Sequence, residues 1–205
     1  MTTWIENPEG GRERGPRGLI RAWFEVLVRP GRFFRNGVSP GDQAPGLTFA
    51  IAVATVFTVG WTVVDPSVIP AISDSIIASA AVTLFIVGVL AAPVGLHLTA
   101  VTAVLSVILA SLRRTDSGSI GLGDRGGVSE TVQVIAYASA PFALAGPPIP
   151  AVRIACAVYA TGLLVVGFRA IHDLSWVRAA IAALPPALIG FWVGYRALAS
   201  LRTLL

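Results

Sequence analysis

The sequence predicts an all-α fold, a polytopic bundle of about five transmembrane helices with an amphipathic interfacial helix at the N-terminus. Hydrophobic residues make up 55% of the 205 residues and charged residues only 13%, about half the charged share of a soluble domain. The apolar residues occur in long continuous stretches and do not alternate as the strands of a membrane barrel do. Because backbone polar groups in hydrocarbon must be paired internally, such stretches are expected to be helices.

The N-terminal region divides into a polar terminus and an amphipathic segment. Residues 1–17 are rich in Gly, Pro and charge, and we expect them to be disordered. Residues 18–36 place apolar side chains at helical spacing, with basic residues on the other side, as in helices that lie in the membrane interface. The alternative is a helix packed on the protein's own cytosolic side. The apolar face comprises Ile20, Trp23, Phe24 and Leu27, and the residues expected at the membrane surface are Arg17, Arg21, Trp23, Phe24, Arg29 and Arg32.

Five apolar stretches are expected to cross the membrane, since a span needs about 20 residues. They are residues 46–64, a span within 76–112, and residues 128–146, 151–168 and 176–198. The second stretch is longer than one span requires. It forms either one span kinked at Pro93, with an interfacial or re-entrant lead-in at 71–82, or two spans joined by a turn at 93–95. Arg153, near the outer end of the fourth span, is expected to snorkel to the interface.

The arginine distribution favours the single kinked span. All fifteen basic residues are Arg. Seven precede residue 36, three lie in the 113–127 loop, and none lies in the 65–75 connection. Cytoplasmic loops are enriched in basic residues. One span within 76–112 places both Arg-bearing segments in the cytoplasm. We therefore expect a multi-pass cell-membrane protein with a cytoplasmic N-terminus.

Several kinds of chemistry are excluded by composition. Lys is absent, which removes phosphate loops of the Walker type and Schiff-base chemistry. The single Cys156 permits no disulfide framework or thiolate metal site. Gly121, Gly123 and Gly126 match a dinucleotide-binding spacing, but they lie in a polar loop without a preceding strand, so we expect a flexible linker. No nucleophile–base pair is found either. We expect no enzyme activity, no cofactor, no metal and no nucleic-acid partner.

Two features inside the spans are candidates for function or packing. His97 has an ionisable side chain, and an ionisable residue in a span is a functional candidate; the alternative is a structural hydrogen bond. Gly190 and Gly194 form a Gly-x-x-x-Gly pair, which lets helices approach closely within the chain or between copies.

Three motifs occur in order along the chain. Residues 23–30 read Trp-Phe-Glu-Val-Leu-Val-Arg-Pro and are followed by Phe33 and Phe34. Residues 136–141 read Ala-Tyr-Ala-Ser-Ala-Pro, and residues 167–169 read Gly-Phe-Arg, followed by His172. Together they resemble the Yip-domain family of Ypt/Rab-interacting five-span membrane proteins, in its prokaryotic branch, and the resemblance covers about residues 22–186. It implies functional or motif positions at His97, Tyr137, Ser139, Pro141, Arg169 and His172.

The resemblance implies a membrane architecture and no specific activity. The Asp-Leu-Tyr-Gly-Pro stretch of eukaryotic members is absent, and a polar insertion displaces the Gly-Gly pair after the second span. The resemblance assigns residues 46–201 to a transmembrane Yip-like domain.

Two functions are weighed. The first is a non-enzymatic scaffold that organises membrane or binds partners: the bilayer, with anionic lipids at the cytoplasmic face, and other membrane proteins or further copies of the chain. The alternative is a small-solute transporter or permease subunit. Its support is the prolines inside spans, since broken helices build midplane sites in transporters. A midplane cavity lined by His97 and Tyr137 would favour the transporter. A filled core with an exposed amphipathic helix would favour the scaffold.

Overall fold

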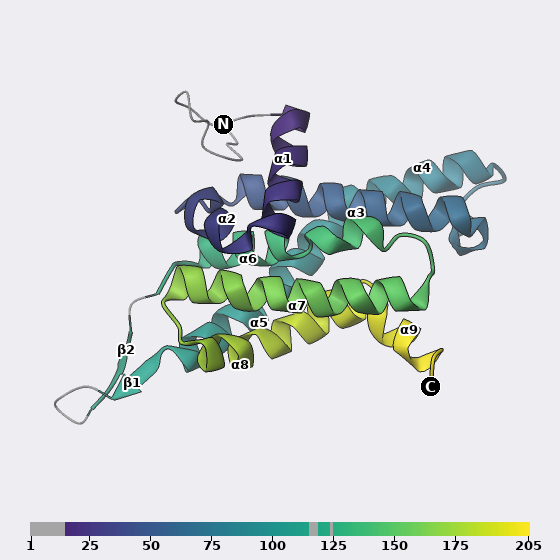
Figure 1. Ribbon diagram of the computed structural model, residues 1–205. Helices are drawn as coiled ribbons and strands as arrows, with labels where there is room; N and C mark the ends of the chain where they lie inside the picture. Colours follow the sequence, from purple (N-terminus) through teal and green to yellow (C-terminus); the bar gives the residue numbers. More distant parts are fainter. Residues whose placement is uncertain (1–14, 115–118, 124) are drawn as a thin grey trace.

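A computed structural model describes residues 15–114, 119–123 and 125–205, and these residues are almost entirely helical (Figure 1). The α-helices are α1 (Gly15–Val28), α2 (Pro30–Gly37), α3 (Ala44–Val64), α4 (Ile76–Ile86), α5 (Ala92–Ala110), α6 (Val128–Ala138), α7 (Pro150–His172), α8 (Trp176–Ala187) and α9 (Ala197–Arg202). Tighter 3₁₀ turns are η1 (Pro66–Val68) and η3 (Ala140–Leu144), and wider π turns are η2 (Val87–Ala91) and η4 (Leu188–Val193). The predicted all-α class is confirmed, apart from a short antiparallel ribbon of β1 (Leu112–Arg114) and β2 (Ile120–Leu122) in the polar loop.

Within the described residues, four helices are long and apolar enough to cross a membrane, namely Ala44–Val64, Ile76–Ala110, Pro150–His172 and Trp176–Val193. The second is one continuous helix of 35 residues, as the arginine distribution favoured. Of the interfacial or re-entrant lead-in expected at 71–82, residues 76–82 form the first turns of this helix. The expected distortion lies at η2, just before Pro93. Proline lacks an N–H and its ring crowds the carbonyl four residues earlier, and the wider turn accommodates both effects.

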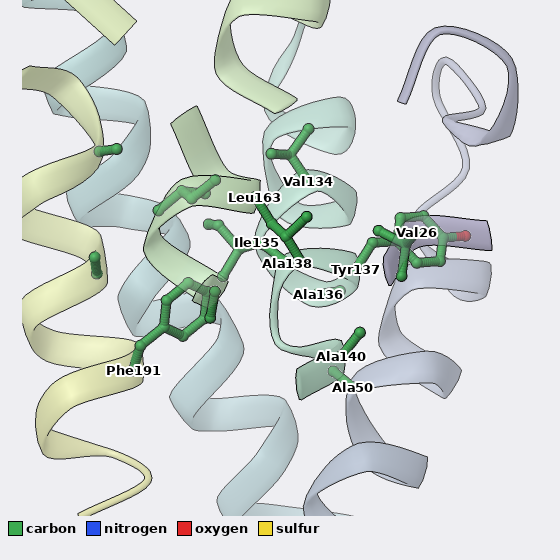
Figure 2. Close-up of a cluster of buried hydrophobic side chains, with 14 of the residues drawn as sticks. Val26, Ala50, Val134, Ile135, Ala136, Tyr137, Ala138, Ala140, Leu163 and Phe191 are labelled. Carbon is green, nitrogen blue, oxygen red and sulfur yellow. The ribbon is translucent and has the colours of Figure 1, made fainter. Parts of the chain in front are cut away.

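The span expected at 128–146 is not one unbroken α-helix. The α-helix α6 ends at Ala138, and the chain continues as the 3₁₀ turn η3. The reason is Pro141, which has no N–H and disfavours helical geometry in the residue before it. This segment is nevertheless the centre of the molecule. Every residue from 131 to 142 is buried, and α6 packs against α3, α5 and α7 (Figures 1 and 2).

Glycines on the neighbouring helices let them approach this central segment closely. A Cβ atom on Gly46 of α3 would lie 2.9 Å from Gln133 Cγ, and one on Gly167 of α7 would collide with Val134. A Cβ on Gly146 would lie 2.8 Å from the Cα of Gly60, so backbone meets backbone there. Small residues at such contacts are what allow close packing in lipid, where burial of apolar surface drives little.

Two buried polar side chains tie loops to the bundle. The Gln133 amide accepts from the Ser39 N–H at 3.0 Å and donates to the Ser39 carbonyl at 2.6 Å. Arg153 is 4% exposed, so the expectation that it snorkels to the interface was wrong. It donates instead to the carbonyls of Ala145 and Gly146, at 3.2 and 2.8 Å. These carbonyls follow a 3₁₀ turn and would otherwise lack partners in an apolar interior.

The 37–44 connection, the polar loop and the α7–α8 turn meet at one end of the bundle (Figure 1). The Arg113 guanidinium donates to the Asp173 carbonyl, and Arg178 donates to the carbonyls of Ala110 and Leu112, all at 3.1 Å. The flexible linker expected at Gly126 was wrong for that residue, because its N–H donates to the Ile171 carbonyl at 3.2 Å. A Cβ atom there would lie 2.5 Å from the Ile171 side chain, so only glycine fits.

Candidate functional site

Helix α1 presents three different faces. Gly18, Ala22 and Val26 are buried against the bundle. Outside this contact, Ile20, Phe24 and Val28 are 66%, 58% and 56% exposed. Arg17, Arg21 and Glu25 form the third, polar face. The apolar face expected from the sequence is therefore divided: Ile20 and Phe24 face outward, while Trp23 and Leu27 are half-buried.

Two hydrogen bonds fix α1 across the side of the bundle. The Trp23 indole N–H donates to the Ala140 carbonyl at 2.9 Å, and the Tyr159 hydroxyl donates to the Leu27 carbonyl. In Figure 1, α1 crosses the direction of α3 and α7 and does not run beside them. The helix begins at Gly15 with Pro16 in its first turn, a position that proline favours. Residues 15–17 are thus helical and were wrongly assigned to a disordered terminus; residues 1–14 lie outside the described chain.

An apolar hollow of about 180 Å³ lies between α1 and α3. The α1 side is formed by Leu19, Ile20 and Trp23. The opposite wall includes Phe49, Ala52, Val53, Val56 and Ala143. Its lining residues are all hydrophobic, so the underside of α1 offers a surface suited to hydrocarbon.

Helix α2 separates its aromatic and basic side chains. Phe33 and Phe34 are buried in the bundle, and the Phe33 ring meets the Tyr137 ring edge to face at 4.8 Å. Arg32 and Arg35 are exposed, as is Arg29 just before the helix. The aromatic pair anchors the segment while the guanidinium groups face away from the protein.

The motif residues on the central segment belong to the core. Tyr137 is fully buried, and its ring also packs on Phe49 at 5.0 Å. The Ser139 hydroxyl donates to the Ala136 carbonyl at 2.6 Å. Pro141 is buried in η3. These residues shape the break between α6 and η3.

The second motif pair lies at the end of α7. Arg169 is exposed and its guanidinium stacks on Trp176 at 4.5 Å. His172 is fully buried, with its Nε2 atom 3.3 Å from the Thr131 hydroxyl. Because that hydroxyl donates its single hydrogen to the Gly127 carbonyl at 2.9 Å, the imidazole donates to the hydroxyl oxygen. His172 therefore joins the end of α7 to the start of α6.

His97 lies apart from these residues. Its side chain is exposed on the outer surface of α5, and Nδ1 lies 2.7 Å from the carbonyl of Pro93, one turn earlier. Among the residues that the structure describes, no group of three potential metal ligands is found. A second cavity, of about 420 Å³, lies between α3, α5, α6 and η4. Neither His97 nor Tyr137 lines it.

The two glycines of the predicted packing pair differ. A Cβ atom on Gly190 would lie 2.7 Å from the Thr99 side chain of α5, so Gly190 packs within the chain. A Cβ on Gly194 would meet only the backbone of its own helix. Gly167 belongs to the Gly-Phe-Arg motif at 167–169, whereas no packing role was expected for Gly46 or Gln133. For Gln133 a signal existed: it is the only amide side chain inside any of the five predicted spans.

Long apolar helices arranged around a buried central segment define a multi-pass integral membrane protein. The chain belongs to the Yip1 domain family, whose model matches residues 24–196. The members of this family are generally non-catalytic membrane-trafficking proteins. No similar protein was found among curated proteins or among solved structures.

Proposed function

We propose that this protein is a non-enzymatic scaffold of the membrane surface, which organises lipid through α1 and α2 and offers a platform for partner membrane proteins. One observation carries the proposal: α1 is fixed to the bundle on one side and exposes Ile20, Phe24 and Val28 on another. A helix that only packed on its own protein would expose polar residues there. A helix with protein, lipid and water on three sides needs all three kinds of face.

The basic residues add an attraction for anionic head groups. Arg29, Arg32 and Arg35 are exposed beside α1. Each basic residue near an anionic surface contributes about 1 kcal/mol, and salt screens this term. Burial of the exposed α1 side chains contributes about 25 cal/mol per Å² and is insensitive to salt. Binding of lipid at this surface should therefore weaken with salt and not vanish.

The orientation and span number belong to the same proposal. The end that carries α2 and the polar loop faces the cytoplasm of a prokaryotic cell, and α6 with η3 makes a fifth crossing packed among α3, α5 and α7. The arginines at that end support the orientation. A cysteine at Ser119, in a Cys156→Ser background, should resist a membrane-impermeant thiol reagent in intact cells. External labelling there would reverse the orientation.

The scaffold is tested by measuring what surrounds α1 in the full-length protein. Nitroxide labels at Phe24→Cys and Arg32→Cys, each in the Cys156→Ser background, are read in liposomes by their collision with oxygen and with a water-soluble nickel chelate. Residue 24 should favour oxygen, which concentrates in lipid, and residue 32 should favour the chelate. Equal exposure of both labels to the chelate would show that α1 faces water, and the proposal would lose its main observation.

The transporter alternative receives less support from the geometry. A transporter was expected to have a midplane site lined by His97 and Tyr137. His97 is instead exposed on the outer surface, and Tyr137 is packed among aromatic rings. The cavity between α3, α5, α6 and η4 has no Asp, Glu, His or Arg in its lining. Coupled transport of a polar solute normally uses such groups.

A further inference from the structure

A cavity of about 420 Å³ lies between α3, the η2–α5 segment, α6 and η4. An apolar cavity of about 150 Å³ already holds a benzene molecule. This one is therefore large enough for a substantial length of hydrocarbon chain. Ala50 and Ile135, labelled in Figure 2, lie on its walls.

The two π turns among the described residues both face this cavity. Val87 and Ala91 come from η2, and Ile189, Gly190 and Phe191 come from η4. A π turn widens a helix and is frequent at functional sites. Two such turns, distant in sequence, thus border the same space. Leu98 and Ile189 line the cavity and are also 62% and 47% exposed, so it opens toward the lipid-facing side of the bundle.

The lining suits hydrocarbon and not a polar solute. Its polar side chains are mainly hydroxyls, and those of Thr58, Thr83 and Thr99 each donate to a carbonyl of their own helix at 2.8 Å. Their hydrogens are therefore already used. A bound polar molecule would lose its own hydrogen bonds without replacement, which is costly in an apolar site.

A positive charge lies at one end of the cavity. Trp61 lines it, and the guanidinium groups of Arg153 and Arg196 lie over the indole ring at 4.7 and 4.9 Å. Arg153 is buried and already donates to carbonyls, whereas Arg196 is exposed. Arg196 also adopts a left-handed backbone conformation with φ of 61°, a strained geometry that is common at functional positions. Within the described part of the chain, neither guanidinium has an acidic partner.

We propose that this cavity binds one acyl chain of an anionic phospholipid whose phosphate is held by Arg196. The walls supply the apolar surface, the opening beside Leu98 and Ile189 admits the chain from the bilayer, and the guanidinium supplies the only charged contact. The site lies at the opposite end of the bundle from α2 and does not depend on the proposed scaffold role.

Photolabelling of the wild-type protein tests the cavity. The probe is a phosphatidylglycerol with a diazirine on one acyl chain, in liposomes, followed by peptide mapping. Ile135, Ala136 and Ser139 lie on the cavity wall and are shielded from bulk lipid, since α6 is buried. Labels on residues 135–139 are expected. Labels confined to outward-facing residues of α3, α4 and α7 would overturn the proposal.

Variants then separate the chain from the head group. Ala54→Phe, which fills the cavity, should reduce labelling of α6 at least about tenfold, while Ala155→Phe on the exposed side of α7 should not. Arg196→Gln should remove a preference of about tenfold for phosphatidylglycerol over phosphatidylcholine, the scale of one lost charged hydrogen bond. Arg202→Gln, exposed near the same end, is its control. An unchanged preference in Arg196→Gln would refute the phosphate contact.

Discussion

Helices α4 and α6 have the same length of 11 residues but opposite environments. In α4 the side chains are apolar except Ser79 and Thr83, and Ser79 is the only buried residue. In α6 the sequence includes Thr131, Gln133 and Tyr137, and all residues from 131 onward are buried. The more polar helix is therefore the inner one. Apolar side chains are as stable in lipid as in the protein interior, but lipid offers no hydrogen-bond partners. Polar side chains are therefore buried within the protein.

The two helices are also held by different forces. Glycines at positions 46 and 167 let α3 and α7 come close to α6, and Gln133 binds the chain before α3. Helix α4 has few neighbours besides η2 and α3, and in Figure 1 it lies at the outer edge of the bundle, beside the end of α3. Substitutions should therefore damage α6 through packing and hydrogen bonding, and α4 through its contact with lipid.

The largest effect is expected for Gly167→Leu. The Cβ atom alone collides with Val134 and would lie 3.2 Å from the Phe34 ring. Excess volume in a packed core typically costs about 1–3 kcal/mol, and a leucine at a site too small for alanine should exceed that range. We expect little folded protein by size-exclusion chromatography in detergent. Gly162→Leu on the same helix, where a Cβ atom meets nothing within 4 Å, should fold normally. Equal folding of both variants would refute the close contact between α6 and α7.

The next effect concerns α4. Phe85 is exposed, and Phe85→Arg should impair membrane insertion if that surface contacts lipid, because an arginine at the centre of a span costs about 2.5–3.5 kcal/mol. The measurement is the fraction of protein resistant to carbonate extraction, with Phe85→Leu as the control. Insertion of Phe85→Arg at the wild-type level would mean that α4 projects into water or lies at the membrane edge, and the contrast with α6 would lose its explanation.

Hydropathy predicts the lipid-facing helices and fails for the central one. The stretches at 46–64 and 151–168 were placed to within a few residues, because their side chains must satisfy lipid and little else. The break after Ala138 was not expected, although Pro141 was noticed inside the stretch. Within a protein interior, neighbouring side chains satisfy the freed carbonyls, so the helix can end where a lipid-exposed one could not.

The functional surfaces were predictable only in part. Helical spacing located α1, but spacing cannot say which half of an apolar face packs on protein, and Trp23 docks on Ala140 while Phe24 faces outward. Arg153 was expected at the interface, but it donates to the carbonyls of Ala145 and Gly146. The sequence does not show the path of the turn that presents these carbonyls, so the contact could not be predicted. The cavity depends on four separate segments and left no local pattern.

A smaller loss is expected for Gln133→Leu, which keeps the volume and removes both hydrogen bonds to Ser39. The Ser39 N–H and carbonyl are buried there, and an unsatisfied buried group costs about 1–3 kcal/mol. We expect a net destabilisation of about 2 kcal/mol, since leucine suits an apolar core. Thermal unfolding in detergent measures it. Gln43→Leu, before α3, should remain within about 0.5 kcal/mol of wild type. A fully stable Gln133→Leu protein would show that the connection before α3 is held by Phe33 and Phe34 alone.

The smallest effect is expected for Gly190→Ala. The new Cβ atom would meet the Thr99 side chain at 2.7 Å, and Thr99 has a hydroxyl fixed to the Gly95 carbonyl, so it cannot rotate away without losing that bond. Against this, alanine gains about 1 kcal/mol of helix propensity over glycine. We expect a net loss of about 1 kcal/mol in the free energy of unfolding, measured by thermal unfolding.

Removing the opposing atoms in Gly190→Ala/Thr99→Ala should recover most of this loss, and a double-mutant cycle isolates the coupling between the two positions. Gly95→Ala, where a Cβ atom meets nothing within 4 Å, should be neutral or stabilising. Additive losses in the cycle would mean that α5 and η4 are not in direct contact at this point, and that the cavity between them is wider than the structure shows.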